Sequence, residues 1–106
     1  MHPVSRFEII VTSKEVEKIT KVLDAEKVRG YSIIRDVIGK GHSGNVSDDV
    51  DLGSTQLSNV FIICYCSKDK IEPIATKIKP ILNKYGGVGY LFDAIEIHSV
   101  RGVASN

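Results

Sequence analysis

The sequence has almost no net charge and no long apolar run, and both shortages limit what the protein can be. The formal charge of its 106 residues is +1 at pH 7, so no strong field draws the chain toward nucleic acid or an anionic membrane. No apolar run approaches the roughly 20 residues of a membrane-spanning helix, and segment 1–6 lacks the apolar core of a signal peptide. We therefore expect a soluble cytoplasmic protein that does not bind nucleic acid.

Cysteine is also scarce, with Cys64 and Cys66 the only two. They lie two residues apart in a segment that reads as a strand, so both point to the same face. A disulfide between them would need an unusual backbone, and Cys-x-Cys without a second pair is not a zinc-ribbon spacing. We interpret them as buried thiols that pack as small apolar side chains. A metal site that combines them with His98 is the alternative.

Residue patterns that carry catalysis are missing as well. No serine, histidine and aspartate, and no cysteine and histidine, stand in an arrangement that supports nucleophilic catalysis. The acids Asp48, Asp49 and Asp51 lack the spacing of a calcium-binding loop, and we interpret them as a solvated acidic patch. The sequence therefore predicts that the protein is not an enzyme.

The residues that are present describe two similar halves. Four segments are rich in β-branched and apolar residues and are predicted as strands: 7–12, 31–38, 60–66 and 88–98. Helical spacing of apolar residues follows the first and the third strand. This order predicts an α+β fold, a ferredoxin-like βαββαβ sandwich with both helices on one face of the sheet. We assign residues 1–106 to a single domain with its core at 6–98 and a flexible tail at 99–106.

Helix ends can also be predicted from local patterns. Thr12 and Glu15 have the spacing of a capping box at the start of the first helix, with Ser13 as a rival cap. Ser67 is expected to cap the second helix, and Tyr85-Gly86-Gly87 to close it.

The third predicted strand is apolar on both of its faces. Residues Val60, Ile62, Cys64 and Cys66 alternate with Phe61, Ile63 and Tyr65. Two helices can cover only one face of the sheet, and no further layer remains in the chain to cover the other. We infer that other subunits cover it.

A long glycine-rich segment separates the two halves, at about 39–57. It opens with Gly39-Lys40-Gly41-His42-Ser43-Gly44. Glycines let a ligand approach the backbone closely, and successive N–H groups in such a turn can bind an anion. Lys40 could add a charge toward a phosphate, and His42 and Ser43 could form hydrogen bonds. The alternative interpretation is a flexible hairpin tip with solvated polar residues.

Several of these segments together resemble the PII-like signalling proteins. The motifs are the first strand, Gly30-Tyr31-Ser32-Ile33, Gly39-Lys40-Gly41, Asn59-Val60-Phe61-Ile62 and Tyr85-Gly86-Gly87. The likeness runs from about Phe7 to His98. It is greatest to the SbtB-type regulators of bicarbonate transport and to the carboxysome-associated PII-like proteins.

The resemblance implies a homotrimer with nucleotide sites in the clefts between subunits, and a long loop, the T-loop, that contacts a target protein. The implied ligands are AMP, ADP, ATP or cyclic AMP, with bicarbonate in the carboxysomal branch, and no prosthetic group. The target could be a membrane transporter in inorganic carbon uptake, which would place the protein at the membrane periphery. The residues implied to line the cleft are Gly30, Tyr31, Ser32, Gly39, Lys40, Gly41 and Gly87.

The chain departs from the family pattern where phosphate would bind. The two arginines that follow Gly-Lys-Gly in the bicarbonate-transport regulators are absent here, so Lys40, His42 or Arg101 would have to replace them. The Gly-Asp-Gly-Lys motif of the nitrogen-sensing members is also missing before the last strand, which argues against nitrogen signalling through ATP and 2-oxoglutarate. The alternative function is a trimeric metal- or small-anion-binding module, similar to the divalent-cation tolerance proteins.

Overall fold

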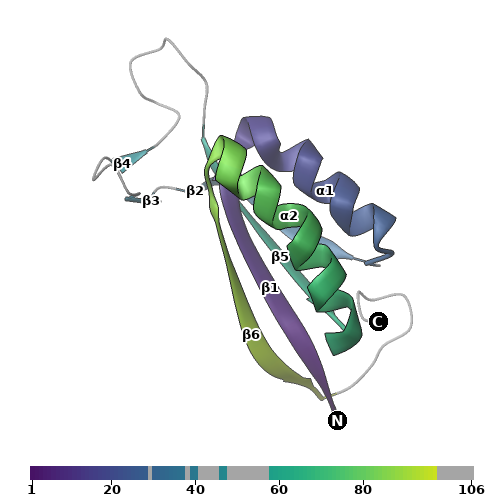
Figure 1. The fold of residues 1–106 in the computed structure, drawn as a ribbon. Helices are drawn as coiled ribbons and strands as arrows, with labels where there is room; N and C mark the ends of the chain where they lie inside the picture. The colour runs from purple at the N-terminus through teal and green to yellow at the C-terminus, as the bar shows by residue number, and fades with distance from the viewer. Residues whose placement is uncertain (29, 38, 41–45, 48–57, 98–106) are drawn as a thin grey trace.

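The computed structural model describes residues 1–28, 30–37, 39–40, 46–47 and 58–97. Its main sheet is antiparallel and four-stranded, in the order β2-β5-β1-β6. The strands are β1 (His2–Thr12), β2 (Tyr31–Val37), β5 (Asn59–Cys66) and β6 (Val88–Glu96). Both helices, α1 (Val16–Ala25) and α2 (Ile71–Tyr85), lie on one face of this sheet (Figure 1). The ferredoxin-like sandwich predicted from the sequence is confirmed.

Some predicted boundaries need correction. Strand β1 begins at His2 rather than at Phe7, because it pairs with β6 along nearly its whole length, from His2 opposite Glu96 to Ile10 opposite Val88. Strand β6 ends at Glu96, and His98 lies outside the described residues.

The predicted helix caps are wrong in detail. A 3-10 turn, Ser13–Glu15, precedes α1, and Thr12 makes no side-chain capping hydrogen bond. The carboxylate of Glu15 instead accepts a hydrogen bond from Lys18, at 2.8 Å. Ser67 likewise precedes a 3-10 turn, Lys68–Lys70, without a side-chain cap. The extra turn at each helix start satisfies backbone groups that a capping side chain would otherwise satisfy.

The hydrophobic core lies between the helices and the sheet. Its most deeply buried side chains are Ile9, Val11, Val60, Ile62, Cys64 and Cys66 from the sheet and Ile19, Leu23, Ile74 and Ile78 from the helices. The prediction of buried thiols is therefore confirmed. Among the described residues no helix has the length and hydropathy needed to cross a membrane.

Two lysines of the second half fasten the end of α1. The Lys70 ammonium donates hydrogen bonds to the backbone carbonyls of Glu26 at 3.1 Å and Lys27 at 3.2 Å. Lys77 of α2 forms an ion pair with the Glu26 carboxylate. Carbonyls at a helix C-terminus lack partners within the helix and carry partial negative charge. These contacts therefore hold the turn that leads into β2 against the start of α2.

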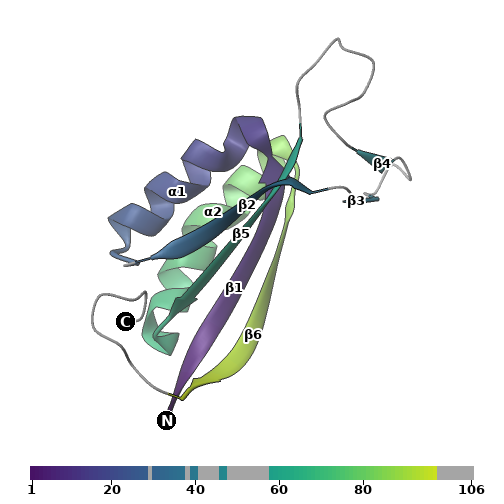
Figure 2. The same cartoon turned by 180° about the vertical axis from the view of Figure 1, so that it is seen from behind.

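No helix among the described residues lies on the second face of the sheet, which is seen from behind in Figure 2. We call it the open face. Direct strand partners share a face, so pairing assigns to it His2, Val4, Arg6, Glu8, Ile10, Ser32, Ile34, Phe61, Ile63, Tyr65, Val88, Tyr90, Phe92, Ala94 and Glu96. Several of these apolar side chains are about half exposed, including Ile34, Tyr90 and Phe92. The prediction that the sheet has two apolar faces is confirmed.

A β-bulge interrupts β2 just before the loop. Ile34 pairs with Phe61 and Val37 pairs with Asn59, so β2 has one residue more than β5 over this interval. Within it Asp36 adopts a φ of 61°, in the left-handed region. Asparagine, aspartate and glycine tolerate this region, whereas β-branched residues do not. The bulge turns the chain at the point where it leaves the sheet.

Replacing Asp36 by valine should destabilise the protein by about 1–3 kcal/mol, because a β-branched residue is strained at positive φ. Asp36→Gly is the matched control and should change stability by less than about 1 kcal/mol, since glycine adopts this conformation freely. Chemical denaturation measures both. Equal stability of the two variants would show that the backbone at this position relaxes.

Candidate functional site

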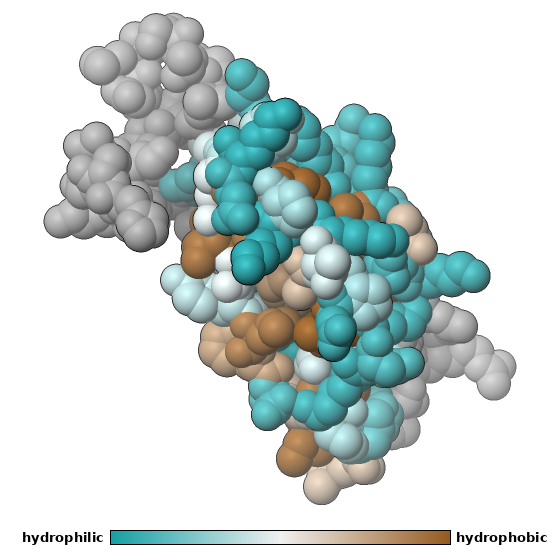
Figure 3. Space-filling model, viewed as in Figure 1, coloured by the Kyte–Doolittle hydropathy of each residue, from teal (hydrophilic) through white to brown (hydrophobic). Residues whose placement is uncertain are grey.

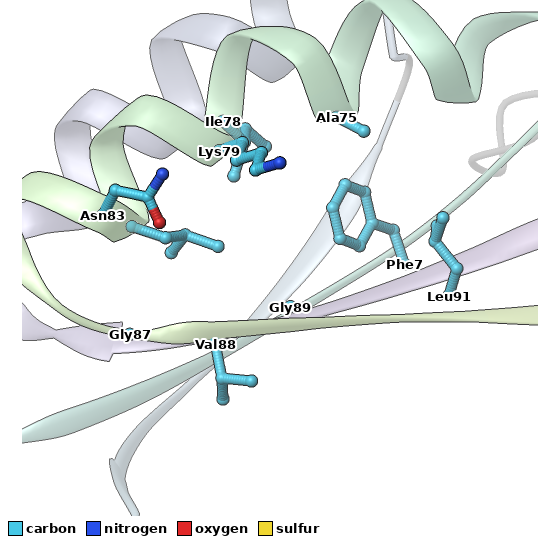
Figure 4. A pocket seen from close by; sticks show the side chains of 10 residues that line it. Phe7, Ala75, Ile78, Lys79, Asn83, Gly87, Val88, Gly89 and Leu91 are labelled. Carbon is cyan, nitrogen blue, oxygen red and sulfur yellow. The ribbon is translucent and has the colours of Figure 1, made fainter. Parts of the chain in front are cut away.

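Four open-face side chains form a continuous row across the sheet at the end nearest the loop. Val88, Ile10, Phe61 and Ile34 are successive strand partners. The row therefore spans three inter-strand steps, or about 14 Å. Val88 points away from α2, whereas Phe7 and Leu91 point toward it (Figure 4). We call this set the loop-root row; it offers a flat apolar surface beside the point where β2 leads into the loop.

Gly87 lies at the β6 end of this row and has a structural role that can be measured. A Cβ added there would lie 2.8 Å from the carbonyl oxygen of Ile10 and 2.9 Å from Val11 Cγ1, and φ is +127°. No L-residue with a side chain fits without movement of the β1 backbone. Gly86 has a φ of +88° but no atom within 4 Å of its added Cβ. The two glycines end α2 as predicted, and Gly87 brings the chain close to the loop-root row.

Gly39 and Lys40 lie at the β2 end. Together they form the short strand β3, which pairs with β4 (Val46–Ser47). Gly41, His42, Ser43 and Arg101, four of the predicted site residues, lie outside the described residues, as does the acidic patch.

Gly30, Tyr31 and Ser32 are at the opposite end of β2. Seven residues of strand separate this end from the loop, a length of roughly 20 Å. Tyr31 and Ser32 also face opposite ways. Tyr31 pairs with Cys64 on the helix side and donates a hydrogen bond to the Asp24 carboxylate at 3.1 Å, and burial raises the pKa of its phenol. Ser32 is exposed on the open face. One protomer therefore does not bring both groups of predicted residues together.

Sequence reasoning missed the apolar half of this candidate site. Ile10, Phe61 and Val88 were recognisable only as members of strands, because strand register decides which of them lie in one row. The usable signal was the position of Phe61 two residues after the loop-side end of its strand, together with glycines before the last strand.

A cavity of about 350 Å³ lies on the other side of the sheet, between α2 and β6. Phe7, Leu82 and Leu91 form its apolar lining, and Lys79 and Asn83 come from exposed positions of α2 (Figure 4). Gly89 also lines the cavity, and a Cβ added there would lie 2.9 Å from the Phe7 ring. The cavity shares Gly87 with the loop-root end but opens on the opposite face.

The two thiols lie in the core and interact with each other. Their hydrogen bond, together with burial, raises the pKa of the Cys64 thiol, and the same hydrogen bond lowers the pKa of the Cys66 thiol. Both side chains are at most 1% exposed. In the part of the chain that the structure describes, no group of three or more histidine, cysteine or acidic residues could hold a metal ion.

Comparison with known proteins identifies the class of protein that this fold and site define. The sequence model of the family described as "Nitrogen regulatory protein P-II" matches residues 4–102. The chain therefore belongs to the P-II family, and the resemblance stated from its motifs is confirmed. No curated protein is similar enough in sequence to count as a match.

Solved structures agree with this assignment. CPII from Thiomonas intermedia K12, a nitrogen regulatory PII-like protein bound to ADP, AMP and bicarbonate, is 25% identical, with 88% of this chain and 87% of CPII covered, at a TM-score of 0.79. A PII-like signaling protein from Thermus thermophilus is 15% identical over 88% of this chain and 87% of that one, with a TM-score of 0.66. GlnK of B. subtilis, solved in complex with ATP, is also 15% identical, with 87% and 83% covered and a TM-score of 0.61. The two lower identities show a shared fold.

Gly87→Ala should destabilise the protein by about 2–4 kcal/mol, since the added methyl overlaps the β1 backbone at a strained φ. The matched variant Gly86→Ala meets no atom but has a φ of 88° and a ψ of 160°, a region that essentially only glycine adopts, and should lose about 1–3 kcal/mol from backbone strain alone, less than Gly87→Ala. Thermal unfolding would compare them. Equal losses would mean that β1 moves aside and that Gly87 is not required for packing.

Proposed function

We propose that the protein is a PII-like signalling regulator that binds an adenine nucleotide in the clefts between the subunits of a homotrimer. It acts by binding and carries out no catalysis. The observation that carries the proposal is the apolar loop-root row at the end of the sheet from which the chain leads on to Gly39 and Lys40, in a chain that belongs to the P-II family. CPII, bound to ADP, AMP and bicarbonate, is the similar protein that indicates the ligand class.

Each part of a nucleotide would find a suited partner there. The base would lie on the apolar surface of Ile10 and Phe61, since aromatic and aliphatic side chains pack well against a purine ring. The phosphates would lie at the backbone of Gly39 and Gly41, with the Lys40 ammonium nearby. His42, Ser43 and Arg101 are further candidates for phosphate contacts in place of the family's arginines.

The cleft needs two protomers. Gly30 and Ser32 lie at the end of β2 away from the loop, so they cannot border a ligand held at Gly39 of the same chain. We propose that one protomer contributes the loop-root row, Gly39, Lys40 and Gly87, and that the next protomer contributes the backbone of Gly30, Tyr31 and Ser32. Such a head-to-tail arrangement closes into a ring of three.

Regulation would follow from the position of the ligand. A nucleotide at Gly39 and Lys40 orders the base of loop 39–57 and shifts which loop conformations are populated. A target protein then distinguishes the states through that loop. The resemblance favours a target in inorganic carbon uptake or metabolism, such as a bicarbonate transporter, with bicarbonate as a second ligand.

Isothermal titration calorimetry with AMP, ADP, ATP and cyclic AMP, each with and without bicarbonate, tests the binding site. At least one nucleotide should bind with a Kd below the millimolar range. Lys40→Ala should weaken it by about 10-fold or more, because a charge-assisted contact to phosphate is lost.

Two controls make the result specific. Lys79→Ala removes an exposed lysine on the helix side and should leave affinity unchanged. Adenosine, which has no phosphate, should bind wild type and Lys40→Ala equally. No binding of any nucleotide at millimolar concentration would refute the proposal.

A further inference from the structure

A charged pair lies within the apolar part of the open face, apart from the His2–Glu96 contact at the N-terminal end of β1. Arg6 and Glu8 are adjacent open-face positions of β1; Arg6 lies between Tyr65 and Phe92, and Glu8 between Ile63 and Tyr90. Charged side chains at the centre of an apolar surface are costly when that surface is covered, unless each is paired. Their presence there therefore calls for a physical explanation.

The Arg6 side chain is held in one position by its neighbours. Its Nε and Nη2 atoms both lie 2.6 Å from Glu8 Oε2, and its Nη1 donates to the Tyr65 hydroxyl, also at 2.6 Å. The guanidinium carbon lies 5.5 Å from the centre of the Tyr65 ring and 6.0 Å from that of Phe92. The hydrogen bond to Glu8 raises the pKa of Arg6, so the charge is permanent. A fixed, charged group is suited to orient a partner.

The pair still has bonding capacity toward a partner. A guanidinium carries five N–H groups, and the three contacts above use one on each nitrogen and only the Oε2 atom of Glu8. The open face therefore presents donors and an acceptor side by side. A second copy of the same face supplies an acceptor for those donors and donors for that acceptor, whereas a different partner would have to carry a matching pair.

We propose that the Arg6–Glu8 pair fixes the register in which copies of this chain pack on the open face, with Arg6 of one copy donating to Glu8 of the next. The inference rests on the trimer of the proposed function and names the residues that select it. Apolar contact is non-directional and tolerates several packings. A charged pair that loses its hydration on packing is different: it tolerates only the packings in which its remaining donors and acceptor find hydrogen-bond partners.

Four variants test the inference, with native mass spectrometry and light scattering for size and amide NMR spectra for symmetry. Wild type should give one assembly with one amide peak per residue. Arg6→Met leaves Glu8 unpaired and should raise the concentration at which subunits dissociate by roughly a hundredfold. The double variant R6M/E8M should still associate, but with mixed sizes or multiple peaks per residue, because the face is then purely apolar.

The control variant, E17M/K21M, removes an exposed ion pair on the helix layer and should behave as wild type. Arg6→Lys keeps the proposal testable if Arg6→Met fails to fold. It keeps the positive charge but loses the planar guanidinium, and it should weaken association by about 10-fold. A single symmetric trimer from R6M/E8M would overturn this inference alone. A monomeric wild type would overturn the trimer as well, while nucleotide affinity is measured separately by calorimetry.

Discussion

The structure depends on a sheet that has two apolar faces but only one layer of helices. On the covered face, β1 and β5 pack against α1 and α2 with side chains such as Ile9 and Ile62 fully buried. On the other, Phe61 and Ile63 are only half buried, and Tyr90 is about half exposed. Burial of such area is the main favourable term in association. One protomer therefore has a complete core but leaves an apolar face exposed to water. Because other copies are expected to cover that face, we propose the ligand site at a boundary between copies.

The hydropathy space-filling view from the helix side shows how apolar residues are distributed around the covered face (Figure 3). Hydrophilic residues dominate the helix side, and apolar residues gather toward the β6 edge. Strand β6 is an edge strand with exposed Leu91 and Phe92. Edge strands of this kind invite pairing or coverage by another chain. The open face and the β6 edge thus both favour coverage by another copy of the chain.

The sequence alone was enough to predict those features that depend on a local pattern. Alternation in Val60–Cys66 predicted both apolar faces, and Gly86-Gly87 predicted the end of α2, because each depends on neighbouring residues alone. The N-terminal extension of β1 was missed because it depends on pairing with β6, more than eighty residues away for His2 and Glu96. The contact of Arg6 with Tyr65 joins residues 59 apart and follows only from register. Asp36 gave no signal, since aspartate is common in ordinary backbone as well as at positive φ.

In the proposed trimer, the lysine contacts at the end of α1 would make one half of each cleft stiffer than the other. Lys70 fastens the turn before β2, and thus the neighbourhood of Gly30 and Tyr31, to the second helix. At its far end β2 passes through a bulge and leaves the sheet. In a closed ring each nucleotide would contact the segment of Gly30 and Tyr31 from one subunit, which the lysine contacts hold in place, and the loop-root row of its neighbour. A nucleotide bound in one cleft would then act on the loop of a single subunit, so its effect would pass from each subunit to the next in one direction around the ring.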